Sequence, residues 1–190
     1  MSRFRIAILG DSLTAGYGLH GQDALPTRLR VELERRGIQA TVADAGISGD
    51  TLADGLRRME RDIPPDVDLC IVALGANDMM QHRPVRELTA DLEAILRRLA
   101  AKNIAALVCG MRAPPWFGAY AIAFDAVFPE TTRRLGVPLH DFLLEGVALN
   151  PAYVLPDRIH PNAKGIEIVA RNLAETVATC VAQTMQRPCA

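Results

Sequence analysis

Residues 6–14 read IAILGDSLT, a short apolar run that ends at a glycine and continues directly into polar residues. Four apolar residues in a row are typical of a buried parallel strand. The stretch VDLCIVALGAND at residues 67–78 has the same pattern, with a longer apolar run before its glycine. The two stretches therefore predict central strands of a parallel sheet, each followed by a polar loop at its carboxyl end.

Candidate helices and strands alternate along the rest of the chain. Apolar residues at helical spacing predict helices over residues 25–36, 51–61, 85–101, 120–135 and 165–185. Further strands are predicted over residues 40–45, 104–109 and 137–139. Strands separated by helices favour right-handed crossovers and a mostly parallel sheet covered on both faces. We expect a single three-layer α/β domain over residues 1–190, since no repeat or linker interrupts the pattern.

The composition is that of an ordinary globular protein, with 49% hydrophobic and 23% charged residues among 190. The formal net charge of -1 argues against a nucleic-acid partner, because nucleic-acid binders normally carry a basic excess. Mixed charges such as those of residues 57–61 are interpreted as a solvated helix face. No apolar run is long enough to span a bilayer, so we expect no stable membrane insertion.

The N-terminus and the cysteines bear on the compartment. Residues 1–5 lead straight into the first strand without the features of a signal peptide, which predicts a cytoplasmic protein, or an exported one if a leader has been removed. Cys70 and Cys109 fall in apolar runs and are expected to be buried free thiols. A disulfide between Cys180 and Cys189 remains an alternative at the C-terminal end.

Four polar motifs stand where a parallel sheet would bring them together. GDSLT at residues 10–14, GISGDT at 46–51 and GAND at 75–78 each follow a predicted strand, and DRIHPN at 157–162 precedes the last helix. Each motif alone could be ordinary turn chemistry, because turns favour Gly, Asp, Asn and Ser. Ligands of open parallel sheets bind beyond the carboxyl ends of the strands, so we expect the motifs to form one site.

Together the motifs contain the groups that acyl transfer requires. Ser12 is the candidate nucleophile, His160 the candidate base, and Asp157 the carboxylate that orients the base. The candidate oxyanion donors are the backbone N–H groups of Ser12 and Gly49 and the side-chain amide of Asn77. Under the structural alternative, Ser12 and Asp157 cap helical turns and Asn77 occupies a left-handed turn.

Other polar residues near the motifs receive structural roles. Asp11 is expected to tie its own loop through side-chain-to-backbone hydrogen bonds. His20, His82 and His140 lack a neighbouring carboxylate pattern and are expected to be surface or packing residues.

Apolar residues next to the motifs suggest an acyl-binding site, because flexible thioethers and aromatic rings suit an apolar ligand. The alternative is that they only pack the local loops. The candidates are Met79, Met80, Pro115, Trp116, Phe117 and Ile159.

In this order, the four motifs resemble those of the SGNH hydrolases, also called GDSL-type esterases and lipases, over nearly the whole chain. The resemblance assigns Ser12, Gly49, Asn77, Asp157 and His160 the roles given above. GISGDT and the stretch GMRAPP further resemble the thioesterase I, protease I and lysophospholipase L1 subgroup, whose members are often labelled arylesterases. The resemblance implies a flavodoxin-like, five-stranded parallel sheet of order 2-1-3-4-5, and hydrolysis of esters and thioesters of loose specificity.

Two positions depart from the subgroup's pattern. Asp44 stands where relatives often have Asn, and Arg158 where they often have Gly. Neither is a catalytic position, but Arg158 lies beside the candidate base and could narrow the cleft or attract anionic substrates.

The expected function is therefore hydrolysis of short- to medium-chain acyl or aryl esters, with thioesters as a further class and no metal or cofactor. An acyl-CoA thioesterase, a lysophospholipase and a non-catalytic acyl-binding module are the alternatives. A nucleotide-binding domain is disfavoured because the first loop lacks the GxGxxG spacing and the P-loop lysine. A metal hydrolase is disfavoured because Asp157 and His160 have no further ligands at metal-binding spacing. The sequence does not predict the oligomeric state.

Overall fold

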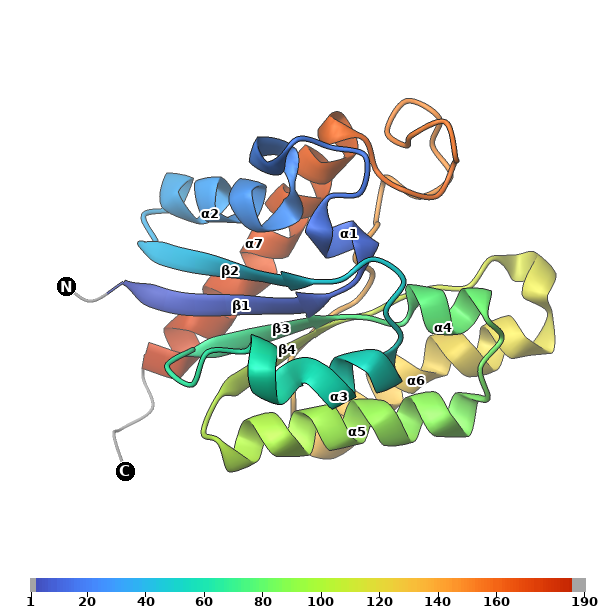
Figure 1. Ribbon diagram of the computed structural model, residues 1–190, viewed down its shortest axis with the longest axis horizontal. Coiled ribbons are helices and arrows are strands. Elements are labelled where there is room, and N and C mark those ends of the chain that lie inside the picture. The colour runs from blue at the N-terminus through green and yellow to red at the C-terminus, as the bar shows by residue number, and fades with distance from the viewer. Residues whose placement is uncertain (1–2, 186–190) are drawn as a thin grey trace.

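The computed structural model describes residues 3–185, and its five parallel strands form one sheet in the order β2-β1-β3-β4-β5 (Figure 1). This order and the parallel direction confirm the predicted fold class. The strands are β1 (Phe4–Gly10), β2 (Ala40–Gly46), β3 (Leu69–Ala73), β4 (Ala105–Cys109) and β5 (Leu139–His140).

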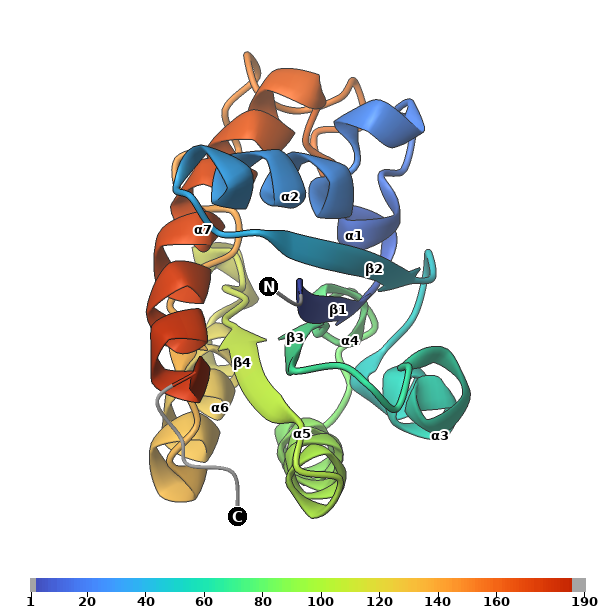
Figure 2. The ribbon, with the colours of Figure 1, turned by 90° about the vertical axis from the view of Figure 1, so that its left-hand side faces the viewer.

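Helices cover both faces of the sheet, as the alternating pattern predicts (Figures 1 and 2). Helices α2 and α7 pack together on one face, while α3, α5 and α6 follow one another along the other. None of the helices within residues 3–185 is both long enough and apolar enough to cross a membrane. The helices are α1 (Ser12–Ala15), η1 (Gly21–Asp23), α2 (Leu25–Arg35), α3 (Leu52–Asp62), α4 (Ala76–Met80), α5 (Val85–Ala101), η2 (Pro115–Phe117), α6 (Ala119–Leu135) and α7 (Ala163–Met185).

The register of the central strands decides where the polar loops begin. Gly10, the last residue of β1, lies opposite Gly46 at the end of β2 and Ala73 at the end of β3. Every residue of β3 is buried, because this strand lies between neighbours in the sheet and beneath helices on both faces. The three strands therefore end at one level, and the loops after them start side by side.

Strand β5 differs from the prediction, which placed it at residues 137–139. It spans Leu139–His140, because Val137 closes the end of the preceding helix and Pro138 cannot donate a backbone hydrogen bond. The backbone N–H of Val137 donates to the carbonyl of Thr132 (3.0 Å) and completes the C-terminal turn of α6 beyond the left-handed Gly136. Pro138 has no N–H to donate to β4. The strand consequently starts later and includes His140.

The cysteines within the described residues are free. Cys70, Cys109 and Cys180 are buried thiols, as expected for the first two. Burial raises the pKa of Cys70 to about 12, which makes this thiol a poor nucleophile. Cys189 lies outside the described residues, so the alternative of a Cys180–Cys189 disulfide is not addressed.

Candidate active site

Ser12 is the first residue of α1, immediately after β1. The N-cap of this short helix is Asp11, whose Oδ1 accepts a hydrogen bond from the Leu13 N–H (2.9 Å), so the capping role considered for Ser12 belongs to its neighbour. Only glycine fits at position 10, since a Cβ there would lie 2.0 Å from Thr14 Oγ1. The tight turn places Ser12 at the strand end with 9% of its surface exposed.

A chain of hydrogen bonds joins Ser12 to the loop before α7. His160 Nε2 lies 2.9 Å from Ser12 Oγ, and His160 Nδ1 lies 2.7 Å from Asp157 Oδ2. An ionised carboxylate can only accept, so Nδ1 carries the proton and Nε2 accepts from the serine hydroxyl. The structure thus brings the three predicted residues together in the order carboxylate, imidazole and hydroxyl.

The loop that carries Asp157 is built around this carboxylate. Asp157 Oδ1 accepts hydrogen bonds from the backbone N–H groups of Ile159 (2.9 Å) and His160 (3.0 Å). These bonds, that of Ile159 above all, lower the pKa of Asp157 to about 2. Arg158 stands at φ 60°, a left-handed conformation that favours glycine. Its side chain is exposed.

The two other expected oxyanion donors lie on the neighbouring loops. Gly49 is exposed between β2 and α3 at φ 91°, which a residue with a side chain rarely adopts. Asn77 lies in α4 rather than in the left-handed turn considered as an alternative. Its Nδ2 donates to the carbonyl of Asp50 (2.9 Å) and to Asp11 Oδ2 (3.2 Å). Asn77 therefore binds both the residue after Gly49 and the residue before Ser12.

Arg58 corrects the interpretation of residues 57–61 as a solvated face. It is 8% exposed, and its guanidinium donates to the Gly10 carbonyl (2.9 Å) and to Asp50 Oδ2 (2.5 Å). This residue ties the end of β1 to the loop of Gly49. The burial of Arg58 could have been predicted from the sequence. Leu52, Gly55 and Arg58 share one face at three-residue spacing, and the first two are small or apolar.

Asp78 is a second buried polar residue that the sequence did not single out. It is fully buried, its Oδ2 accepts from the Leu52 N–H at the start of α3 (2.9 Å), and its Oδ1 accepts from Arg83 (2.5 Å). Asp78 thereby fixes α4, and with it Asn77, against the first turn of α3.

The candidate acyl-site residues differ in exposure. Met79 packs partly against the core, whereas Met80, Trp116 and Ile159 are 51%, 69% and 47% exposed. Pro115 is also exposed, in η2.

His82 connects two of the segments that carry these candidates. Its ring lies 4.5 Å from that of Phe117 and 5.1 Å from that of Tyr120, measured between centroids. The segment after α4 and η2 therefore form one aromatic wall. Ile159 belongs to a different segment, the loop of His160.

Asp11 is the most strongly perturbed carboxyl group next to Ser12. It has no exposed surface, and burial raises its pKa to about 6. The hydrogen bond from the Leu13 N–H offsets part of this cost, and Asn77 Nδ2 donates to the other carboxylate oxygen. The expected structural role of Asp11 is thus observed, together with a link to the Asn77 loop.

The raised pKa of Asp11 makes the stability depend on pH. Between about pH 4 and pH 6 the folded protein holds a proton that the unfolded chain has released, so the free energy of unfolding falls as the pH rises. We expect Asp11→Asn to remove about 2 kcal/mol of the fall between pH 4 and pH 7. Urea unfolding of both proteins at pH 4 and pH 7 measures it. Asp157→Asn is the control, since the contribution of Asp157 is complete above pH 4. Parallel profiles for Asp11→Asn and wild type would contradict the assignment.

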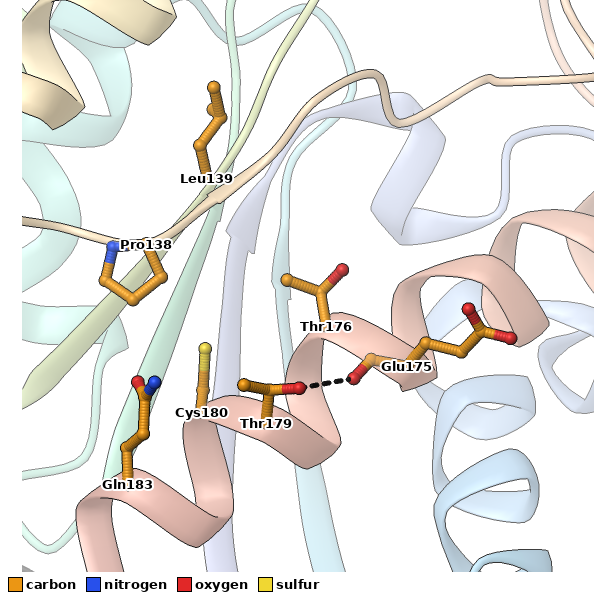
Figure 3. A pocket seen from close by; sticks show the side chains of 7 residues that line it. All are labelled: Pro138, Leu139, Glu175, Thr176, Thr179, Cys180 and Gln183. Carbon is orange, nitrogen blue, oxygen red and sulfur yellow. Dashed lines mark hydrogen bonds between the residues drawn. The ribbon is translucent and has the colours of Figure 1, made fainter.

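A hollow of about 530 Å³ lies away from the four motifs, between the start of β5 and the C-terminal half of α7 (Figure 3). It is lined by Pro138, Leu139, Glu175, Thr176, Thr179, Cys180 and Gln183. None of these residues belongs to the four motifs. Among residues 3–185, no group of three or more His, Cys, Asp and Glu side chains is arranged to hold a metal ion.

Comparison with known proteins agrees with the motifs. The model of the GDSL-like lipase/acylhydrolase family matches residues 8–168. An arylesterase of Vibrio mimicus is 30% identical over 90% of this chain and 86% of its own length. Thioesterase 1/protease 1/lysophospholipase L1 of Escherichia coli strain K12 is 32% identical over 93% of this chain and 84% of its own length.

A solved structure extends the agreement to three dimensions. AlinE4, an SGNH-hydrolase family esterase, superposes with a TM-score of 0.79 at 37% identity and covers 98% of this chain and 99% of its own. Because the family model spans most of the chain and the relatives cover most of their own length, the chain belongs to the GDSL-like lipase/acylhydrolase family and is a serine ester hydrolase.

Proposed function

We propose that Ser12, His160 and Asp157 are the catalytic residues and that the protein hydrolyses carboxylic esters through an acyl-enzyme on Ser12. The observation that carries this proposal is the chain of hydrogen bonds from Asp157 through His160 to Ser12 Oγ. Its distances of 2.7 and 2.9 Å are those of a base already in contact with its nucleophile.

In the first half of the reaction, Ser12 Oγ attacks the ester carbonyl carbon and its proton passes to His160 Nε2. Asp157 stabilises the imidazolium that forms and keeps the Nδ1 proton in place. The tetrahedral intermediate collapses when the bond to the leaving oxygen breaks and His160 donates its proton to that oxygen. The products are the alcohol and the acyl-enzyme.

The second half repeats these steps with water. His160 Nε2 takes a proton from a water molecule whose oxygen attacks the acyl carbon. The bond between this carbon and Ser12 Oγ then breaks, and the serine regains its proton from His160. The acid is released, and only water has been consumed.

The proposed oxyanion donors are the N–H groups of Ser12 and Gly49 and the amide of Asn77. In the structure, both hydrogens of the Asn77 amide face protein acceptors. The bond to Asp11 is the longer of the two, at 3.2 Å. We expect this hydrogen to be shared with the oxyanion, while the Asp50 carbonyl keeps the amide in position.

The proposed substrates are short- to medium-chain acyl or aryl esters, with thioesters as a second class. The names of the relatives, an arylesterase and a thioesterase/lysophospholipase, support both classes. The acyl chain would lie along the candidate acyl-site side chains, which are exposed or partly buried. These are Met79, Met80, Pro115, Trp116, Phe117 and Ile159.

A fluorophosphonate probe tests the proposed nucleophile. The activated serine should displace fluoride from phosphorus and become phosphonylated, and peptide mass spectrometry should locate the adduct on Ser12. A second sample, unfolded in urea before the probe is added, is the control for unspecific reaction. A probe that leaves the folded protein unlabelled would overturn the proposal. Rates on acetyl to decanoyl esters, crossed with aryl, alkyl and thiol leaving groups, would then define the substrate class.

The acyl-site proposal predicts a chain-length effect at Phe117. Phe117→Ala removes part of the aromatic wall, so we expect kcat/KM for octanoyl esters to fall about 5- to 20-fold and that for acetyl esters to change less than twofold. Initial rates on p-nitrophenyl esters of increasing length measure it. Ile122→Ala, at a 78% exposed position of α6, is the control for loss of an exposed apolar side chain. An equal effect at all chain lengths would refute a role of Phe117 in acyl binding.

A further inference from the structure

The aromatic ring of Tyr17 lies against the imidazole of His160. The ring centroids are 4.4 Å apart and the planes are inclined by 31°. Tyr17 is 53% exposed, and its hydroxyl has no hydrogen-bond partner among residues 3–185. The face of the ring, rather than the hydroxyl, is therefore what Tyr17 presents to the site.

The backbone fixes Tyr17 relative to the candidate nucleophile. Tyr17 follows α1, and its N–H donates to the carbonyl of Ser12 (3.1 Å). It stands between two left-handed glycines, Gly16 at φ 74° and Gly18 at φ 72°. A Cβ on Gly18 would lie 2.9 Å from Leu155 Cδ1, so the turn also packs against the loop that carries His160. The backbone of Tyr17 is thus held by two segments of the site at once, and its ring contacts His160.

The hydrogen bonds of His160 leave one motion open. Both bonds, to Asp157 and to Ser12, lie in the plane of the imidazole, because ring nitrogens donate and accept in that plane. They resist rotation within the plane but limit tilting out of it far less. An aromatic face packed on the ring opposes that tilting.

The need for this contact changes during the reaction. Once Ser12 Oγ carries the acyl group, it has no proton to donate, and the bond to His160 Nε2 is lost. The imidazole then keeps its hydrogen bond to Asp157 and its ring contact with Tyr17. It must nevertheless stay in place to take a proton from water, and the imidazolium that results is attracted by the face of the aromatic ring.

We propose that Tyr17 is a positioning residue that holds His160 in the acyl-enzyme, so that it matters more for deacylation than for acylation. The proposal rests on the proposed function, since it presupposes an acyl-enzyme on Ser12. It concerns the ring only, and it therefore separates Tyr17→Phe, which keeps the ring, from Tyr17→Ala and Tyr17→Leu, which remove it.

The test measures acylation and deacylation separately with p-nitrophenyl butyrate. The value of kcat/KM reports acylation, and intact-protein mass spectrometry of acid-quenched samples reports the fraction of acylated enzyme at steady state. For Tyr17→Ala and Tyr17→Leu we expect deacylation to slow about 3- to 10-fold and kcat/KM to fall less than twofold. The acylated fraction should rise and the apparent KM should fall. Tyr17→Phe should match wild type within about twofold on every measure.

Three results would overturn the proposal: an unchanged acylated fraction in Tyr17→Ala, equal losses in both steps, or a Tyr17→Phe variant as slow as Tyr17→Ala. Thermal unfolding should be unchanged, because the side chain is more than half exposed. Failure of the proposed function gives a different result, since wild type would then form no acyl-enzyme and react with no fluorophosphonate. If wild type forms the acyl-enzyme and reacts with the fluorophosphonate, and Tyr17→Ala has the same kinetics as wild type, only the role of Tyr17 is refuted.

Discussion

Replacement of Ser12 by alanine is expected to lower kcat on p-nitrophenyl esters by at least about 10³-fold. The change removes the oxygen to which His160 Nε2 is hydrogen-bonded, and with it the covalent route. The proposed oxyanion donors, which are the N–H groups of residues 12 and 49 and the amide of Asn77, remain. Some residual rate over water is therefore expected from the oxyanion site.

The fold should survive this substitution. Ser12 Oγ bonds to a half-buried histidine, while α1 is capped by Asp11, whose bond to the Leu13 N–H does not involve Ser12. We expect the melting temperature of Ser12→Ala to lie within a few degrees of wild type. Fluorophosphonate labelling should disappear together with activity. A stable Ser12→Ala protein that retains more than a tenth of wild-type turnover would contradict the assignment of the nucleophile.

The long elements were predictable because their patterns repeat. Helix α5 spans Val85–Ala101, the range that the apolar spacing predicts, because five buried residues recur along one face. Strand β5 was not placed correctly, since Val137 closes a helix and Pro138 lacks a donor, and neither effect has a period. Helix α4 was not predicted for a similar reason, because its five residues contain too little of a helical repeat.

The residues of the candidate site also differ in how far the sequence predicts them. The proximity of Ser12 and His160 could be predicted because each follows or precedes a regular element within a recognisable motif. Arg58 was misassigned because its charge outweighed its position on a buried face. The contact of Tyr17 with His160 leaves no trace in the sequence, since it joins two distant turns through the shape of their backbones.

Asp157→Asn is expected to lower kcat by about 10³- to 10⁴-fold at neutral pH. The variant keeps an oxygen for the N–H groups of Ile159 and His160, so the loop should keep its shape. In place of Oδ2, however, it presents an amide that donates to Nδ1. The imidazole proton must then move to Nε2, which can no longer accept the proton of Ser12. Steady-state kinetics together with fluorophosphonate labelling at pH 7 measure the loss.

Within residues 3–185, Asp157 is the carboxylate hydrogen-bonded to His160, and no second one is placed to rescue this variant. Asp11 is near enough for its charge to interact with His160, but both its oxygens are engaged by Leu13 and Asn77. Because the pKa of Asp157 is about 2, wild type contains the ionised carboxylate throughout the range above pH 4, and the loss should not require acidification. Activity of Asp157→Asn within tenfold of wild type would show that His160 is oriented by its backbone and by Tyr17 alone. The Tyr17→Ala, Asp157→Asn double variant should then lose the catalytic activity that the Asp157→Asn variant retains.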